Sequence, residues 1–227
     1  MLEESKSLFS FNIGTFPVEI KKELVIQWVV ILIIAILAYW STKGMTKKPN
    51  KKQTVVELLY GTIKNIVIEN MGEKYVSFVP FIGTLGIFIL VLNLTGLVGV
   101  TPPTNNYSVA LGLALITFVV IQANAIKKVG IGHYFLGYGK PLLPMLPLNI
   151  MERVMLPVSL SLRLFGNVLA ATVLVELSYQ ALGSISFFAQ LGLPIFLHAY
   201  FDIFDGAIQM VIFVMLTMLN IKTVAEH

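Results

Sequence analysis

One arginine, Arg163, stands inside the long apolar segment "PVSLSLRLFGN". A charged side chain in a membrane-spanning helix costs roughly 2.5–3.5 kcal/mol on insertion scales and usually marks a pathway or a site. Ser159 and Asn167 are four residues away on either side, so a helix places them on the arginine's face. Thr172 and Glu176 fall at about 180° and 220° from it, on the opposite face. Because a guanidinium stays charged where an ammonium can lose its proton, this position suits a permanent cation that attracts carboxylates and repels mobile cations.

A second set of polar residues occupies the last apolar segment. At about 100° per residue, His198, Asp202, Asp205 and Asn220 all lie within about 40° of Gln209, so they form one stripe. A polar stripe among lipids must face protein or water. A histidine, two carboxylates and an amide in a row suit the passage of protons or other cations. The alternative is a set of interhelical hydrogen bonds with no transport role.

The composition indicates an integral membrane protein. Of 227 residues, 56% are hydrophobic and only 12% are charged, whereas soluble domains carry about 25% charged residues. The absence of cysteine excludes disulfides and thiolate metal sites. Residues 1–23 lack the apolar core of a signal peptide. The clustered lysines indicate membrane topology and not nucleic-acid binding.

The hydropathy pattern predicts an all-α polytopic membrane protein, with residues 1–227 as a single integral-membrane domain. A spanning helix needs about 20 apolar residues. Five segments qualify: 24–42, 78–98, 108–126, 148–182 and 187–221. The last two exceed the length of a perpendicular span, so we expect two long, tilted helices that form a hairpin. Residues 54–71 repeat apolar side chains at helical spacing between charges, which predicts an amphipathic helix at the membrane interface.

The distribution of lysines predicts the orientation. Five lysines lie in residues 43–52 and three in residues 127–140, whereas residues 99–107 and 183–186 carry no charge. By the positive-inside rule the basic loops are cytoplasmic. The cytoplasmic loops are then 43–77 and 127–147, the N-terminus is outside and the C-terminus is in the cytoplasm.

Several stretches resemble one family closely. "PVSLSLRLFGN" and "IQMVIFVMLTMLNI", together with "LVLNLTGLVG" and "PPTNNYSVALGLAL", resemble subunit a of the membrane sector of bacterial rotary ATP synthases. The resemblance covers nearly the whole chain. It implies a multi-pass protein of the bacterial plasma membrane that has no cofactor, no metal site and no catalytic activity of its own.

The resemblance also implies a mechanism. Subunit a packs beside a ring of c subunits, each with one essential carboxylate, and joins the peripheral-stalk subunit b and the rest of the complex. Two offset half-channels lead to the ring, one from each side of the membrane. Arg163 matches the family's essential arginine between them, Asn167 its polar neighbour and Gln209 the glutamine on the facing helix. Ion flow then rotates the ring and drives ATP synthesis in a separate catalytic head.

This sequence departs from the family pattern at three positions. Some relatives carry an acid where Thr172 stands, a histidine or glutamate at Asp202, and an aspartate at Gly96. We therefore expect the half-channels to be lined by Glu176, His198, Asp202, Asp205, Ser159, Thr172 and Asn220. The coupling ion stays open between proton and sodium, because that choice depends largely on the ring.

Two other classes of protein deserve comparison. "DIFDG" (residues 202–206) opens like the metal-binding motif of CDP-alcohol phosphotransferases, but the arginine and the further aspartates of that motif do not follow. A self-contained secondary transporter usually shows paired inverted repeats, which this chain lacks. No GxxxxGK[ST] loop is present, so ATP chemistry does not belong to this chain.

Overall fold

The computed structural model describes residues 7–13, 16–46, 50–130, 146–183 and 196–226. The chain begins with strands β1 (Ser7–Ile13) and β2 (Phe16–Lys21). The longer helices are α1 (Lys22–Thr42), α2 (Lys51–Met71), α3 (Val79–Leu94), α4 (Tyr107–Val129), α6 (Leu146–Gly183) and α8 (Gly206–Glu226). Shorter helical turns are η1 (Glu73–Phe78), η2 (Thr95–Val98), η3 (Pro103–Asn105) and the π-helix η5 (Ala199–Asp205).

Five helical segments are long and apolar enough to cross a membrane, which confirms the predicted fold class. They are Lys22–Thr42, Glu73–Val98, Tyr107–Val129, Leu146–Gly183 and Phe196–Ala225. The predicted segment 187–221 differs in two ways: residues 187–195 lie outside the described residues, and α8 continues to Glu226.

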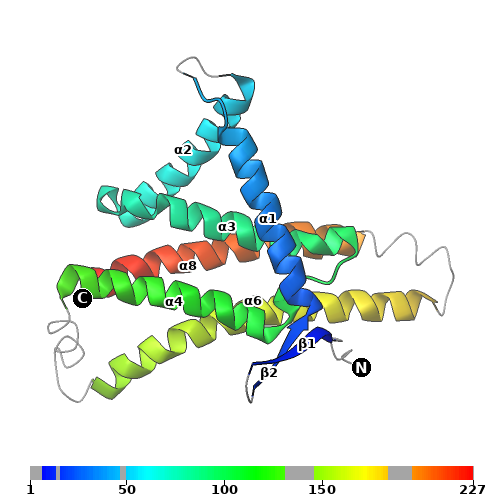
Figure 1. Ribbon diagram of the computed structural model, residues 1–227. Coiled ribbons are helices and arrows are strands. Elements are labelled where there is room, and N and C mark those ends of the chain that lie inside the picture. Colours follow the sequence, from blue (N-terminus) through cyan, green and yellow to red (C-terminus); the bar gives the residue numbers. More distant parts are fainter. Residues whose placement is uncertain (1–6, 14–15, 47–49, 131–145, 184–195, 227) are drawn as a thin grey trace.

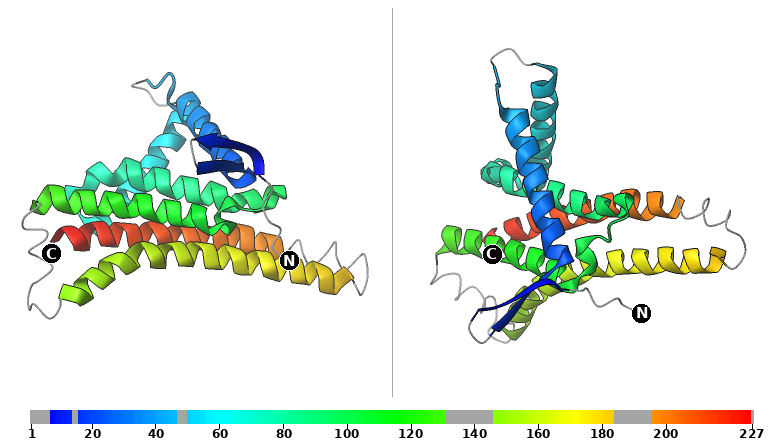
Figure 2. Two further views of the ribbon diagram at one scale, coloured as in Figure 1. Left: turned by 60° about the horizontal axis from the view of Figure 1, so that its bottom comes forward. Right: turned by 45° about the vertical axis from the view of Figure 1, so that its right-hand side comes forward.

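Helices α3, α8, α4 and α6 run side by side, and α1 lies across them (Figure 1). Within this group α8 contacts both α3 and α4, and α4 contacts α6. The 38 residues of α6 correspond to about 57 Å of helix, nearly twice the roughly 30 Å hydrocarbon core. Helix α6 also bends along its length (Figure 2), and Pro157 lies inside it, where its missing N–H removes a helical hydrogen bond.

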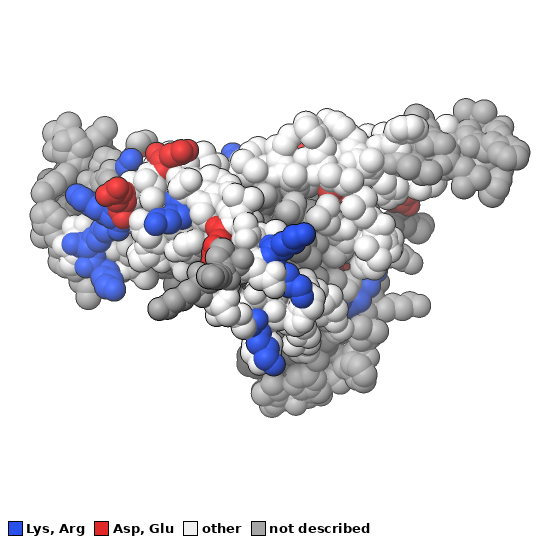
Figure 3. All heavy atoms as spheres, turned by 90° about the horizontal axis from the view of Figure 1, so that it is seen from above, with Lys and Arg blue, Asp and Glu red and all other residues white. Residues whose placement is uncertain are grey.

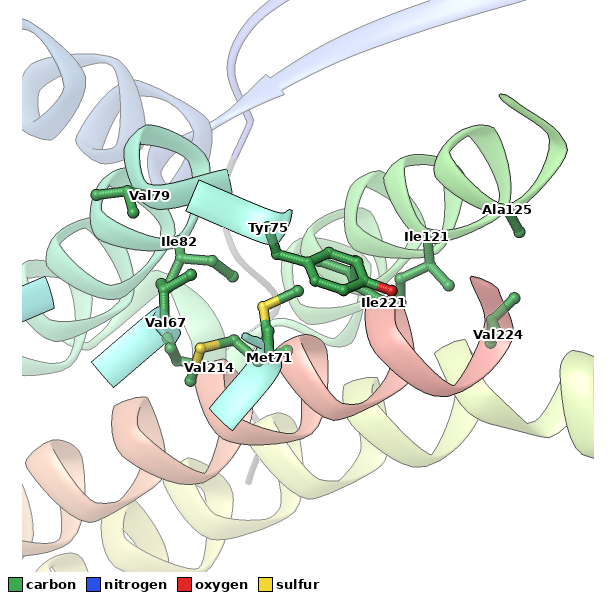
Figure 4. Packing of buried hydrophobic residues seen from close by; sticks show 11 residues of the cluster. Val67, Met71, Tyr75, Val79, Ile82, Ile121, Ala125, Val214, Ile221 and Val224 are labelled. Carbon is green, nitrogen blue, oxygen red and sulfur yellow. The ribbon is translucent and has the colours of Figure 1, made fainter. Parts of the chain in front are cut away.

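One of two clusters of buried hydrophobic residues joins α2, η1, α3, α4 and α8 (Figure 4). Val67, Ile121 and Met218 are fully buried there, and Tyr75 is 2% exposed. The ammonium of Lys128 lies 3.6 Å from the centre of the Tyr75 ring, a cation–π contact at the end of α4. This cluster therefore holds α2, α3 and α8 against the C-terminal end of α4, where Lys127 and Lys128 lie.

The predicted amphipathic helix is α2. It begins at Lys51, whose backbone N–H donates to the Oδ1 of Asn50 at 2.7 Å, and it is followed by Gly72 at φ 96°. Such a positive φ favours glycine because it lacks a Cβ. Only Val67 and Met71 of α2 are buried, so most of its apolar side chains remain free to contact lipid.

The N-terminal segment contains a feature that the sequence analysis did not anticipate. Strands β1 and β2 pair antiparallel, with Phe11 opposite Val18 and Ser10 opposite Glu19. Residues 9–13 alternate apolar and polar types, which is the periodicity of a strand. The ribbon leads directly into α1.

The surface seen in Figure 3 is divided by charge. Lysine, arginine and acidic side chains gather at one end and in the middle of the view, and most of the remaining described surface is uncharged. A wide uncharged surface is what a protein in contact with lipid requires.

Candidate functional site

A cavity of about 590 Å³ lies where the last helix meets α6 and the turn after α3. Its volume is in the range of ligand-binding pockets. Six of the predicted site residues line it: Thr172, Glu176, His198, Asp202, Asp205 and Gln209. The structure thus brings together the polar groups of two helical segments that are separated in the sequence by residues 184–195.

The π-helix η5 carries both aspartates of the cavity. It changes the angular spacing on which the predicted stripe depends, because a π-helix has more residues per turn than an α-helix. His198, Asp202, Asp205 and Gln209 nevertheless line the same cavity. The assumption of a uniform α-helix was therefore wrong for residues 199–205.

His198 and Asp202 form a close polar pair in the cavity. The Nδ1 of His198 lies 2.9 Å from the Oδ2 of Asp202. The histidine side chain is 35% exposed and the aspartate 13%, so the pair spans from the more open to the more enclosed part of the cavity. The ring of Tyr179 lies 6.0 Å from the histidine ring, centre to centre. This arrangement can pass a proton between an imidazole and a carboxylate.

Gln209 lies at the enclosed part of the cavity and is only 1% exposed. Its Oε1 accepts a hydrogen bond from the Nδ2 of Asn167 at 2.7 Å, which joins α8 to α6. Its buried Nε2 has no hydrogen-bond partner among the described residues. Since buried N–H groups are usually paired, this donor is available for a water molecule or another acceptor that enters the cavity.

Arg163 lies outside the cavity, one helical turn before Asn167. Its side chain is exposed, as is that of Ser159. Within the described ranges Arg163 makes no hydrogen bond or ion pair. The structure thus separates Arg163 from the acids of the cavity. Glu176 lines the cavity, whereas Arg163 lies on the exposed surface of α6.

Two of the residues predicted to line the half-channels do not lie in this cavity. Ser159 does not line the cavity, and Asn220 donates its Nδ2 to the carbonyl oxygen of Leu216 on its own helix at 2.8 Å. Asn220 belongs to the other end of α8, far along the helix from Gln209.

Sequence reasoning missed Asn93 of α3 and Thr104 of η3, and it named Gly96 only as a departure from the family pattern. Asn93 is 3% exposed and donates its Nδ2 to the carbonyl oxygen of Gly206 at 3.2 Å. Its Oδ1 accepts from the hydroxyl of Thr104 at 3.3 Å. Gly96 lies against the carboxylate of Asp202. The one signal in the sequence was an asparagine inside the apolar run "LVLNLTG".

Metal binding was not predicted for this chain. Within the described ranges no group of three or more His, Asp or Glu side chains could hold a metal ion. Asp202 and Asp205, the two aspartates of "DIFDG", instead line the cavity together with polar side chains of α6.

The fold and the site together define a polytopic helical membrane protein with an acidic cavity between its long helices. Residues 24–222 match the profile of the family described as ATP synthase A chain. The chain is 31% identical to the sodium-ion-specific ATP synthase subunit a of Propionigenium modestum over 223 residues, covering 91% of this chain and 74% of that protein. It is 32% identical to ATP synthase subunit a of Streptococcus agalactiae serotype III (strain NEM316) over 204 residues, 86% of each chain.

A third relative, ATP synthase subunit a of Geotalea daltonii, is 40% identical over 147 residues, 62% of this chain and 63% of that protein. The chain therefore belongs to the ATP synthase A chain family. Membership places it in the membrane sector of an ATP synthase, as a multi-pass membrane protein.

Proposed function

We propose that this chain is the stator subunit that carries ions to and from the rotating ring, with Arg163 between two half-channels. The observation that carries the proposal is the connection from the cavity to the arginine. Gln209 lines the cavity and is hydrogen-bonded to Asn167 at 2.7 Å, and Asn167 lies one turn from Arg163 on α6. An ion that enters the cavity is thereby led to the surface on which the arginine stands.

Arg163 acts on the carboxylates of the ring. Its guanidinium is exposed and makes no ion pair with the described residues of its own chain, so a carboxylate on a neighbouring helix can approach it. Guanidinium and carboxylate form strong paired hydrogen bonds. The arginine therefore favours the ionised ring carboxylate, which must release its ion, and its fixed charge prevents direct leakage between the half-channels.

The cavity forms the outer half-channel. It is lined by residues of the uncharged loop 99–102, which precedes α4, and by Glu176 near the end of α6. Lys127 and Lys128 lie in the last turn of α4, at the end of that helix away from this loop. By the positive-inside rule the lysine end is cytoplasmic. The N-terminus is then outside and the C-terminus inside, in a bacterial plasma membrane.

The second half-channel runs toward the cytoplasmic end. Ser159 precedes Arg163 on α6, toward the end where that helix begins, and Asn220 lies near the end of α8. Both positions are on the cytoplasmic side of the arginine in this orientation. The two half-channels are thus offset along the helices, as rotation requires.

The partners follow from this role. The exposed face of α6 around Arg163 meets the c ring, and the complex includes the peripheral-stalk subunit b and a catalytic head that makes ATP. The transported ion is a proton or a sodium ion. The named specificity of the Propionigenium modestum relative is for sodium, and the ring carboxylate decides between the two ions for this complex.

The alternatives receive less support. A CDP-alcohol phosphotransferase needs clustered metal ligands, but the described residues contain no such group. A self-contained transporter would not need an arginine on its outer surface. The family match over residues 24–222 favours the stator role over both.

The proposal is tested by removing the two acids of η5 together. The complex carrying Asp202→Asn and Asp205→Asn is purified, reconstituted in vesicles and supplied with ATP. Ion pumping should fall strongly while the amount of assembled complex stays the same. Undiminished pumping would show that the cavity is not part of the ion path.

A further inference from the structure

Gly96, in the turn after α3, lies directly against the carboxylate of Asp202. A Cβ added to Gly96 would stand 2.6 Å from the Oδ1, 2.7 Å from the Cγ and 2.8 Å from the Oδ2 of Asp202. All three distances are shorter than real Cβ contacts. The carboxylate therefore occupies the space that a side chain at position 96 would need.

A second close contact involves Asn93 of α3, three residues before Gly96. A Cβ added to Gly206 would stand 3.1 Å from the Cβ of Asn93. The Nδ2 of Asn93 also donates to the carbonyl oxygen of Gly206 at 3.2 Å, and Thr104 holds the Oδ1 of Asn93 at 3.3 Å. Gly206 is the first residue of α8, directly after η5. The hydrogen bond from Asn93 therefore fixes where the end of the π-helix lies along α3.

We infer that Asn93 and Gly96 are positioning residues that place the Asp202 carboxylate in the cavity, and that a carboxylate carried by position 96 can take its place. The inference rests on the proposed function, in which Asp202 lines the ion path. It adds that the path needs a carboxylate at this point in space, whichever helix supplies it.

The geometry allows the exchange. An aspartate at position 96 would carry its Cγ about 1.5 Å beyond its Cβ, and that Cβ stands 2.7 Å from the present Cγ of Asp202. Once Asp202 is shortened to alanine, the space is empty and the new carboxylate can enter it. It then faces His198, whose Nδ1 is 2.9 Å from the present carboxylate. With both aspartates present, the two carboxylates would compete for one place.

The test compares four versions of the whole complex: Asp202→Ala, Gly96→Asp, both changes together, and Asp202→Ala with Val98→Asp. Val98 is the matched control, because it lies two residues away in the same turn, is 80% exposed and does not line the cavity. ATP-driven pumping in vesicles is measured per assembled complex. Asp202→Ala should lower pumping about tenfold, less than the full effect of a proton-transfer group because other acids remain nearby.

The relocated carboxylate should restore at least half of the lost pumping, and Val98→Asp should restore none. A loss in Asp202→Ala with no recovery in the double variant overturns this inference and leaves the proposed function standing. No loss in Asp202→Ala also overturns the inference, because the ion path would then need no carboxylate at this point, whereas the proposed function is tested separately by removing Asp202 and Asp205 together. Equal recovery with Val98→Asp would show that any nearby acid suffices, which also overturns the inference.

A second measurement tests the placement of Gly96 beside Asp202 even if a variant with a new charge fails to assemble. The chain contains no cysteine, so Gly96→Cys and Asp202→Cys introduce its only two thiols. Mild oxidation should join them in a disulfide, because close Cβ atoms are required for that bond. The pair Val98→Cys and Asp202→Cys should not react. Cross-linking in the control pair alone would overturn the placement of Gly96.

Discussion

The Nδ2 of Asn167 donates a hydrogen bond to the Oε1 of Gln209 at 2.7 Å, and this bond connects the two long helices at the inner end of the cavity. Gln209 is almost fully buried. The pair stands between the acids that line the cavity and the exposed Arg163. It is therefore the point at which the proposed outer half-channel meets the surface of α6.

The first prediction concerns the coupling of these two amides. Asn167→Ala and Gln209→Ala should each lower ATP-driven pumping, but the double variant should lose less than the product of the two effects. A neutral hydrogen bond contributes about 1 kcal/mol, or roughly fivefold in rate. Asn70→Ala on α2, whose Nδ2 bonds to the carbonyl oxygen of Ile66, is the control and should combine additively with Gln209→Ala. Additive behaviour of Asn167 and Gln209 would contradict the bond.

The second prediction concerns His198. If its ring exchanges a proton with the Asp202 carboxylate at 2.9 Å, His198→Ala should lower pumping by about tenfold or more. His198→Gln keeps a hydrogen-bond donor but cannot exchange a proton at neutral pH, so it should preserve assembly without restoring pumping. Pumping rates are measured per assembled complex. A glutamine variant with wild-type pumping would show that the histidine only supports the structure.

The third prediction concerns crowding at Gly96. Gly96→Ala adds one methyl group that would stand 2.6 Å from the Asp202 Oδ1, so the carboxylate must shift from its place 2.9 Å from the His198 Nδ1, and pumping should fall severalfold. Gly112→Ala on α4 is the matched control, because a Cβ there meets nothing within 4 Å. It should pump normally. Equal pumping rates in the two variants would mean that the position of the Asp202 carboxylate does not affect pumping.

The fourth prediction concerns stability. Met218 is fully buried in the core, whereas its neighbour Leu219 is 59% exposed. Met218→Ala should destabilise the subunit by about 2–5 kcal/mol, the usual range for a buried side chain that leaves a cavity. Leu219→Ala should have a much smaller effect. The amount of each variant that resists thermal aggregation in detergent gives the comparison, and a reversed order would contradict the packing of α8.

Much of the fold could be predicted from the sequence because the membrane imposes simple rules. Segments of about 20 apolar residues give the spanning helices, and the bounds of α1 and α4 lie close to those expected. The predicted alignment of His198, Asp202 and Asp205 with Gln209 came from helical spacing. These features depend on hydropathy and periodicity, which are local properties of the chain.

The features that could not be predicted depend on contacts between distant segments. The π-helix at 199–205 breaks the α-helical spacing, and its register is held by Asn93 of another helix. The contact between Gly96 and Asp202 joins residues more than a hundred positions apart. Nothing in the local pattern of either segment indicates it. The β-ribbon was overlooked because its strands are short and lie beside a dominant apolar helix.

Arg163 provides the most direct test of the proposed function. ATP-driven pumping is measured in vesicles that contain the complex with Arg163→Ala, with Lys51→Ala on α2 as a control that removes a cation far from the cavity. Because no other cation of α6 can draw the ring carboxylate into its ionised form at this point, the Arg163→Ala complex should assemble but pump nothing above background. The Lys51→Ala complex should pump normally. Appreciable ATP-driven pumping without Arg163 would contradict its role between the half-channels.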